Sequence, residues 1–161
     1  MGKKGREIVK GDVSRLLQDL HGAYALEWVA HYNFMLAAHV AAGINAPVVA
    51  GVMRKSSEGE LKHANSIAER IVQLGGEPIR DMAQLPARSG CPPFALPEEG
   101  TDLESILKAA LELERHAIGF YQALADKTRA VDIVTHELAE ELLADEVAEE
   151  EELENLLGRS G

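Results

Sequence analysis

Five of the six prolines of this chain lie in one stretch, residues 75–100, and the sequence on either side is almost free of them. Proline removes a backbone donor and breaks helices, so most of this stretch cannot be regular helix. A loop of this length counts against a compact domain unless the fold needs it. A four-helix bundle with one long crossover between two helical hairpins is such a fold. The sequence therefore predicts an antiparallel bundle of two hairpins.

Gly, Pro and Asp mark the ends of the four predicted helices, which lie at about residues 12–42, 47–74, 101–127 and 132–157. Asp12 is the expected N-cap of the first helix, and Pro47 suits the first turn of the second. Gly75 should end that second helix. Thr101 and Glu104 are predicted to form a capping box at the start of the third. We expect a single domain over residues 1–161.

Composition and charge narrow the classes of function. A formal net charge of −11 argues against binding of nucleic acid or an anionic membrane surface. The most apolar window, residues 34–53, is interrupted by polar residues, Gly and Pro, so it should not span a bilayer. One cysteine, Cys91, excludes an intramolecular disulfide framework. With no secretion signal in the first residues, a cytoplasmic location is expected.

Acidic residues occupy positions that should be buried. Helices that pack at shallow angles bury positions spaced alternately three and four residues apart. On the four predicted helices these apolar stripes contain Glu27, Glu60, Glu114 and Glu146. The midpoints of the predicted helices fall near residues 27, 60, 114 and 144, so hairpin packing should bring the four carboxylates to one level.

Four carboxylates in a helical core need counter-charge, because an unpaired buried carboxylate is costly. The basic groups on the stripes near that level are His31 and His63, with Arg70 well above them. Two imidazoles do not balance four carboxylates, so a divalent metal is predicted. Carboxylate oxygens with one or two imidazoles suit iron, with manganese as the alternative, better than metals that prefer thiolates.

The spacing on the second helix favours a dinuclear iron site. Glu60 and His63 form a Glu-x-x-His pair on one helix face. Di-iron bundles combine one Glu from each of two helices with Glu-x-x-His from each of the other two. The second such pair should begin at Glu146, but the residue three positions on is Glu149. The predicted catalytic residues are Glu27, Glu60, His63, Glu114 and Glu146, and the same five are predicted metal ligands. Glu149 is predicted as a metal ligand only.

Four segments, one on each helix, carry a family pattern: ALEWVAHY at 25–32, ELKHA at 60–64, ERHAIGFY at 114–121 and DEVAE at 145–149. They resemble the ferritin superfamily, most closely its Dps-like, bacterioferritin-related branch. The resemblance implies an all-α, ferritin-like four-helix bundle. It also implies a homo-oligomeric cage of twelve or twenty-four subunits that oxidises Fe(II) with O2 or H2O2, stores the iron and protects against oxidative stress.

This chain departs from that pattern at several positions. Glu149 stands in place of the usual last-helix histidine. Some Dps-like members carry a cysteine pair near the iron site, whereas here His116 takes the place of the partner of Cys91. Bacterioferritins bind haem through a methionine between the Glu and His of the second-helix motif. Leu61 and Lys62 occupy those positions here, so no haem is expected.

Other interpretations stay open at this stage. His31 is a candidate metal ligand or a hydrogen-bond partner of one, and Tyr121 is a packing residue or a donor near iron. Glu112 is expected to be solvated rather than a ligand. The acidic run at 149–152 is a solvated face or the lining of a cage. The rival functions are a rubrerythrin-like di-iron or di-manganese peroxidase or oxidase without storage, and a metal-free structural bundle.

Overall fold

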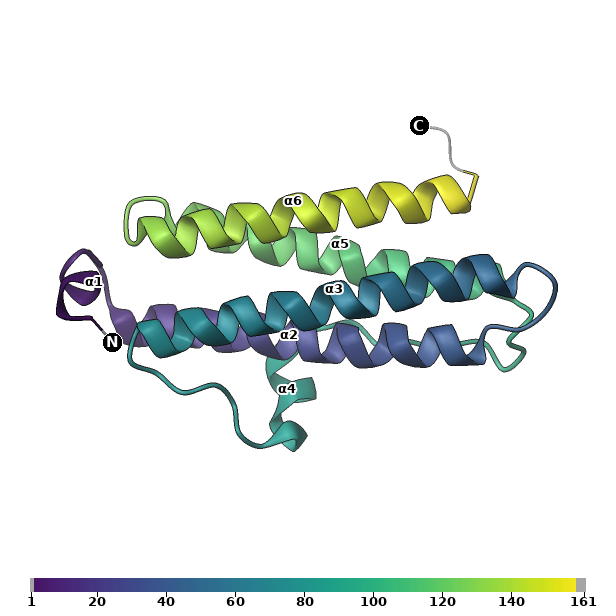
Figure 1. Ribbon diagram of the computed structural model, residues 1–161, viewed down its shortest axis with the longest axis horizontal. Helices are drawn as coiled ribbons and strands as arrows, with labels where there is room; N and C mark the ends of the chain where they lie inside the picture. The colour runs from purple at the N-terminus through teal and green to yellow at the C-terminus, as the bar shows by residue number, and fades with distance from the viewer. Residues whose placement is uncertain (1, 159–161) are drawn as a thin grey trace.

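The computed structural model describes residues 2–158, and these fold into helices joined by turns and one long crossover, with no strand (Figure 1). Four long helices form the antiparallel bundle that the sequence predicts. The helices are α1 (Lys3–Glu7), α2 (Val13–Val40), α3 (Ala46–Gln73), η1 (Met82–Gln84), α4 (Leu85–Ser89), α5 (Leu103–Thr128) and α6 (Ile133–Leu156).

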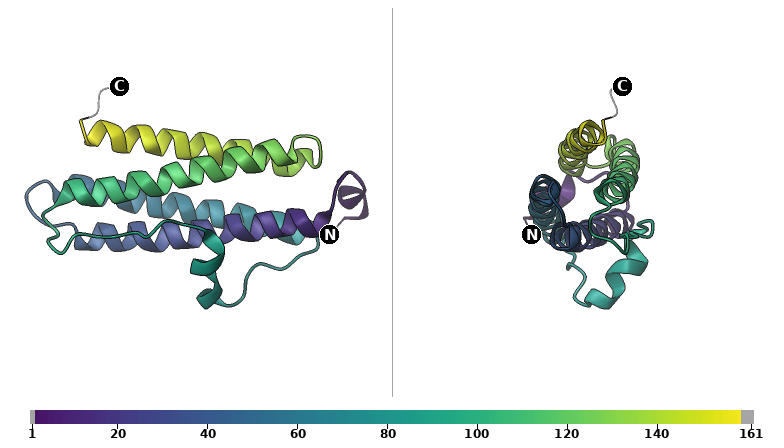
Figure 2. Two further views of the ribbon diagram at one scale, coloured as in Figure 1. Left: turned by 180° about the vertical axis from the view of Figure 1, so that it is seen from behind. Right: turned by 90° about the vertical axis from the view of Figure 1, so that its right-hand side faces the viewer.

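The bundle consists of two hairpins. α2 packs most extensively on α3, and α5 packs most extensively on α6. The crossover leaves α3 at one end of the bundle and runs along its outside to the start of α5 at the other end (Figure 2). On the way, α4 packs against α2. This long connection lets α5 enter the bundle from the same end as the α2–α3 turn.

The ends of the long helices lie within two residues of the predicted positions. Asp12 caps α2 by accepting a hydrogen bond from the Ser14 N–H, and Pro47 lies in the first turn of α3. The predicted capping box at Thr101 and Glu104 is wrong. Asp102 caps α5 instead, its carboxylate accepting from the Ser105 N–H at 3.1 Å.

Short helices appear where the sequence predicts none. α1 precedes the bundle, and η1 and α4 interrupt the crossover. Each has five residues or fewer, too few for a hydrophobic period to be recognisable. None of the helices in residues 2–158 combines the length and the apolar character needed to cross a bilayer.

The hydrophobic core has two halves, and on every long helix the boundary between them falls at a glutamate. In α2 the buried residues of one half end at Leu26 and those of the other begin at Ala30, with Glu27 between them. The boundary between the two halves likewise falls at Glu60, Glu114 and Glu146 on the other helices. The four acids therefore form a polar layer between two apolar halves.

One buried ion pair lies at the end of the bundle where α5 turns into α6. Arg70 on α3 donates to Asp132 at 2.5 Å and to the Thr135 hydroxyl at 2.9 Å. Arg70 and Asp132 are both buried. Arg70 joins the end of α3 to the start of α6, which holds the two hairpins together at this end.

Backbone contacts hold the opposite end. The Ala42 N–H donates to the Gly100 carbonyl at 2.8 Å, tying the α2–α3 turn to the end of the crossover. A Cβ at Gly100 would lie 2.0 Å from the Val40 carbonyl oxygen, so only glycine fits this approach.

Candidate metal centre

The four predicted glutamates meet in the middle of the bundle. Glu27, Glu60, Glu114 and Glu146 come from four different helices, and each is at most 2% exposed. His63 follows Glu60 by one helical turn and is buried beside it. We call these five residues the carboxylate cluster. The structure thus brings together every residue of the predicted catalytic set.

The atoms that could bind a metal ion fall into two overlapping groups. In each, all the atoms lie within 4.8 Å of one another. The first group comprises Glu27, Glu60, His63 and Glu146, and the second comprises Glu60, Glu114 and Glu149. Glu60 belongs to both, which is the position a bridging carboxylate needs. Glu149, the additional predicted ligand, is half-buried at the edge of the second group.

The His63 ring lies among three carboxylates. Its Nδ1 donates to Glu60 Oε2 at 3.2 Å and also lies 3.5 Å from Glu27 Oε2 and 3.3 Å from Glu146 Oε1. An imidazole surrounded in this way is favoured in its protonated form. Among the described residues, His63 is the one basic side chain in contact with these acids.

Burial and like charge shift the protonation of the cluster. Burial raises the pKa of Glu60 well above its ordinary 4.5, and the charges of Glu27 and Glu146 raise it further. The pKa of Glu114 is raised by burial and then by Glu146. Burial lowers the pKa of His63, but contacts with Glu146 and Glu27 outweigh it and bring the value to about 11. A cation that binds here must displace these protons.

Several oxygens of this centre have no hydrogen-bond partner in the described part of the chain. They are Oε2 of Glu27, both carboxylate oxygens of Glu114 and Glu146, and Oε2 of Glu149. Two of them, Glu27 Oε2 and Glu146 Oε1, have the ion-pair contacts with His63 described above, and no hydrogen bond. Buried polar atoms are nearly always paired, so this number of unpaired oxygens in one place needs an explanation. A divalent cation would satisfy them together, and the set of hard oxygens with one imidazole fits iron or manganese.

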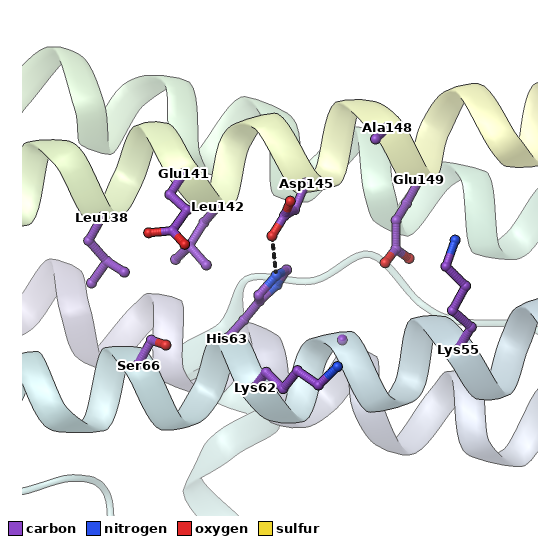
Figure 3. A pocket seen from close by; sticks show the side chains of 11 residues that line it. Lys55, Lys62, His63, Ser66, Leu138, Glu141, Leu142, Asp145, Ala148 and Glu149 are labelled. Carbon is purple, nitrogen blue, oxygen red and sulfur yellow. Dashed lines mark hydrogen bonds and ion pairs between the residues drawn. The ribbon is translucent and has the colours of Figure 1, made fainter.

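A groove between α3 and α6 leads to this centre (Figure 3). It has a volume of about 410 Å³, and His63, Asp145 and Glu149 lie on its walls. The His63 ring reaches across it, with Nε2 3.3 Å from Asp145 Oδ2. Sequence reasoning missed this contact of Asp145. The signal was its position directly before Glu146, which places it on the flank of α6 that faces α3.

Tyr121 and His31 have hydrogen-bond partners in this region. The Tyr121 hydroxyl, fully buried, donates to Glu27 Oε1, so this tyrosine is a donor to the centre as well as a packing residue. His31 Nδ1 instead contacts the carbonyl and hydroxyl of Ser57 at 2.8 and 2.9 Å and lies outside both ligand groups. It joins α2 to α3. Glu112 is exposed and pairs with Arg115.

The crossover places Gly90, the residue before Cys91, close to His116. A Cβ at Gly90 would lie 3.9 Å from His116 Nε2, so His116 packs against the residue that precedes Cys91. His116 belongs to neither ligand group. The Cys91 thiol is half-buried, and burial raises its pKa. A rise in thiol pKa lowers the fraction of reactive thiolate at neutral pH.

Three other acids near this end of α6 pair with basic residues. Glu150 and Glu154 bind Arg115 of α5 at 2.8 and 2.7 Å, and Glu152 binds Lys55 of α3 at 2.6 Å. These ion pairs lie at the surface. Of the acidic run at 149–152, Glu149 alone belongs to a ligand group.

Comparison with known proteins gives a consistent result. The sequence pattern of the ferritin-like domain family matches residues 17–160. The chain is 33% identical over 146 residues to the "DNA protection during starvation protein" of Pyrococcus furiosus. The aligned region covers 91% of this chain and 78% of that protein.

Solved structures share the fold. A dodecameric thioferritin, the bacterioferritin-related protein of Bacteroides fragilis, superposes with a TM-score of 0.90 at 31% identity, covering 98% of this chain and 94% of that one. The Dps protein of Thermosynechococcus elongatus superposes with a TM-score of 0.83 at 18% identity, covering 91% and 92%.

Proposed function

Because this chain belongs to the ferritin-like domain family, we propose that it is an iron-storage protein that oxidises Fe(II) at the carboxylate cluster. The observation that carries this proposal is the buried meeting of four glutamates, His63 and the flanking Glu149, with many of their oxygens unpaired. Two Fe(II) ions are the substrates. Each gives up one electron, and one peroxide molecule accepting both becomes two hydroxide ions. Dioxygen is the alternative oxidant.

The proposed ligands of the two ions are Glu27, Glu60, His63, Glu114 and Glu146, with Glu149 at the edge of the second position. Glu60 is the proposed bridge, because it has an oxygen within reach of both groups. Hard anionic oxygens favour Fe(III) over Fe(II), so this donor set favours oxidation. The apolar halves of the core above and below shield the cluster from water, so that solvent reaches it from the side of the groove.

His63 also has a role in proton handling. In the metal-free protein its Nδ1 carries a proton toward Glu60. That proton must leave before Nδ1 can act as a ligand. Asp145 accepts from Nε2–H, which keeps the remaining proton on Nε2 and leaves the lone pair of Nδ1 facing the cluster.

We further propose that the protein assembles as a twelve-subunit cage, since the B. fragilis protein at 31% identity is dodecameric. The P. furiosus relative is described as protecting DNA during starvation. The net charge of −11 argues against direct contact of this chain with DNA. Protection would then act through removal of Fe(II) and of its oxidant. The absence of haem binding remains a prediction from Leu61 and Lys62.

The double variant Glu60→Ala with His63→Ala tests the oxidation proposal. It should lose rapid Fe(II) oxidation, measured as the rise of ferric absorbance, while circular dichroism shows intact helices. A matched control is Glu58→Ala with Glu69→Ala, two exposed acids on the same helix, which should keep the rate. Rapid oxidation by the first variant would refute the assignment. Separate runs with air and with anaerobic peroxide identify the oxidant.

Native mass distinguishes storage from the rubrerythrin-like alternative. A cage that gains mass on addition of Fe(II) supports storage, whereas a dimer with rapid peroxide turnover supports a peroxidase or oxidase without storage. A protein that takes up no iron after anaerobic Fe(II) loading would instead be a structural bundle.

A further inference from the structure

The helices α3 and α6 face each other in an antiparallel register along the groove. They pack on each other far less extensively than each packs on its hairpin partner. Polar side chains of the two helices meet at intervals along this seam. The pairs are Arg70 with Thr135, His63 with Asp145, and Lys55 with Glu152.

Gly59 leaves an opening between two of these pairs. Lys55, Gly59 and His63 are spaced four residues apart, so they lie on one face of α3. A Cβ at Gly59 would lie 3.2 Å from Glu149 Oε1, so Glu149 of α6 stands opposite this position. Glu149 is the half-buried member of the second ligand group. The opening at Gly59 therefore leads from the groove to the centre.

Lys55 stands at one edge of this opening. Its Nζ lies 2.6 Å from Glu152 Oε2, and its side chain extends from α3 toward α6 beside Glu149 (Figure 3). The hydrogen bond with Glu152 raises the pKa of Lys55, and the charges of Glu152 and Glu149 raise it further, so the side chain keeps its proton. The ammonium is thus a positive charge fixed to the chain where the path to the carboxylates begins.

The ion pair that holds Lys55 is weak enough to open. The Lys55 side chain is 66% exposed and that of Glu152 is 37% exposed. Exposed pairs contribute little to stability, so thermal motion separates them readily. A positive charge in this place nevertheless repels an approaching divalent cation and lowers its rate of association. The pair can therefore slow the passage of a cation without blocking it.

We propose that Lys55 is a gate residue for the centre: its ammonium, held by Glu152 beside Gly59, slows the entry of divalent cations and moves aside to admit them. This inference rests on the proposed metal function of the cluster. Lys55 belongs to neither ligand group, so it affects the rate of entry more than the affinity for the bound cation. Salt screens the repulsion and weakens the effect.

The test follows the binding of Co²⁺ to the metal-free, assembled protein. Trp28, the only tryptophan of the chain, directly follows Glu27, so Co²⁺ at the cluster should quench its fluorescence. Stopped-flow mixing then gives the rate of binding. In Lys55→Gln this rate should rise by about 3- to 10-fold at low ionic strength, and by less in about 0.5 M salt. Lys55→Arg keeps the charge and should keep the wild-type rate.

The matched control is Lys62→Gln, which removes the same charge from another residue of the groove and should leave the rate near that of the wild type. Equilibrium titration of Lys55→Gln should show a smaller change in affinity than in rate. An unchanged rate in Lys55→Gln, or an equal rise in Lys62→Gln, would overturn the gate.

Filling the opening should act in the opposite direction. Gly59→Val adds a branched side chain where the Cβ alone would approach Glu149 Oε1 to 3.2 Å, so Co²⁺ binding should become slower. Gly51→Val is the control, because nothing lies within 4 Å of its Cβ position in the same helix. Circular dichroism checks that both variants keep their helices. Binding by Gly59→Val at the wild-type rate would contradict the position of the opening.

These results are separable from the oxidation assay. Slow Fe(II) oxidation together with faster Co²⁺ binding in Lys55→Gln would argue against the proposed function but support the gate. Rapid oxidation with an unchanged rate of Co²⁺ binding in Lys55→Gln would support the function and refute the gate. A protein that binds no Co²⁺ would refute both.

Discussion

His63 on α3 and Asp145 on α6 lie 3.3 Å apart, Nε2 to Oδ2, across the groove that leads to the carboxylate cluster. His63 faces the cluster with its other nitrogen, so this contact fixes the orientation of the ring from outside. Partners of this kind set the tautomer of a ligating histidine. Asp145 is therefore a positioning residue for the proposed ligand His63.

Replacing Asp145 should weaken cation binding without unfolding the bundle. Asp145→Ala removes the acceptor of Nε2–H, and we expect the affinity of the carboxylate cluster for Zn²⁺ to fall by about 10- to 100-fold. Asp145→Asn keeps an acceptor oxygen and should restore part of the loss. Titration calorimetry measures both. Glu141→Ala, an exposed acid on the wall of the same groove, is the control. Equal affinities for Asp145→Ala and this control would contradict the positioning role.

The stability of the metal-free protein should decrease as pH rises from 5 to 8. The folded pKa values of Glu60, Glu114 and Glu146 lie above the ordinary 4.5, so above that pH the folded protein binds more protons than the unfolded chain. His63 acts in the same direction, since the stability from its proton is complete below pH 6.5 and lost as pH rises through about 11.

Thermal unfolding followed by circular dichroism measures this dependence. With a chelator, the midpoint should be higher at pH 5 than at pH 8. With Mn²⁺ the order should reverse, because bound cations need deprotonated ligands. The variant Glu114→Gln removes one of the raised groups and should flatten the metal-free dependence. A midpoint that rises with pH in the presence of chelator would refute the protonation scheme.

The buried ion pair of Arg70 should matter more than any surface pair. Arg70→Ala leaves Asp132 buried without its cation, and we expect a loss of about 3–5 kcal/mol in the free energy of unfolding. The control is Arg80→Ala, which removes an exposed pair with Glu77 and should change it by about 0.5 kcal/mol or less. Guanidinium unfolding of both variants gives the comparison. Similar losses for both would mean that the Arg70 pair contributes no more than a surface pair.

Two glycines should respond in opposite ways to alanine. At Gly100 a Cβ would lie 2.0 Å from the Val40 carbonyl oxygen, so Gly100→Ala must displace the end of the crossover and lower the melting temperature. Gly51 lies in α3 with nothing within 4 Å of its Cβ position. Gly51→Ala should therefore stabilise the helix by about 0.5–1 kcal/mol. If both variants melt alike, the close approach at Gly100 is not a constraint.

The fold was predictable because its signals are local. Asp12, Pro47 and the proline-rich crossover mark helix ends whatever the tertiary structure. The capping box at Thr101 failed because Asp102, the next residue, also has a capping side chain, and the pattern alone does not choose between neighbours. The five-residue α1 is too short to leave a periodic signal.

The centre was predictable in part. Apolar stripes with one acid each, at matching heights, predicted which glutamates meet. Asp145 was missed because it lies off the apolar stripe of α6. It contacts His63 only because of the angle at which α6 packs against α3. Arg70 was recognised on its stripe, but its partner Asp132 was not, since a helix-initiating aspartate is normally interpreted as a cap.

The proposed ligands are divided between the two hairpins, with Glu27, Glu60 and His63 on α2–α3 and Glu114, Glu146 and Glu149 on α5–α6. During synthesis the first hairpin emerges before the second exists, and neither alone carries both ligand groups. The complete centre arises only when the two hairpins dock. A nascent or partly folded chain thus lacks the complete centre, and the proposed iron oxidation would begin only after the bundle has formed.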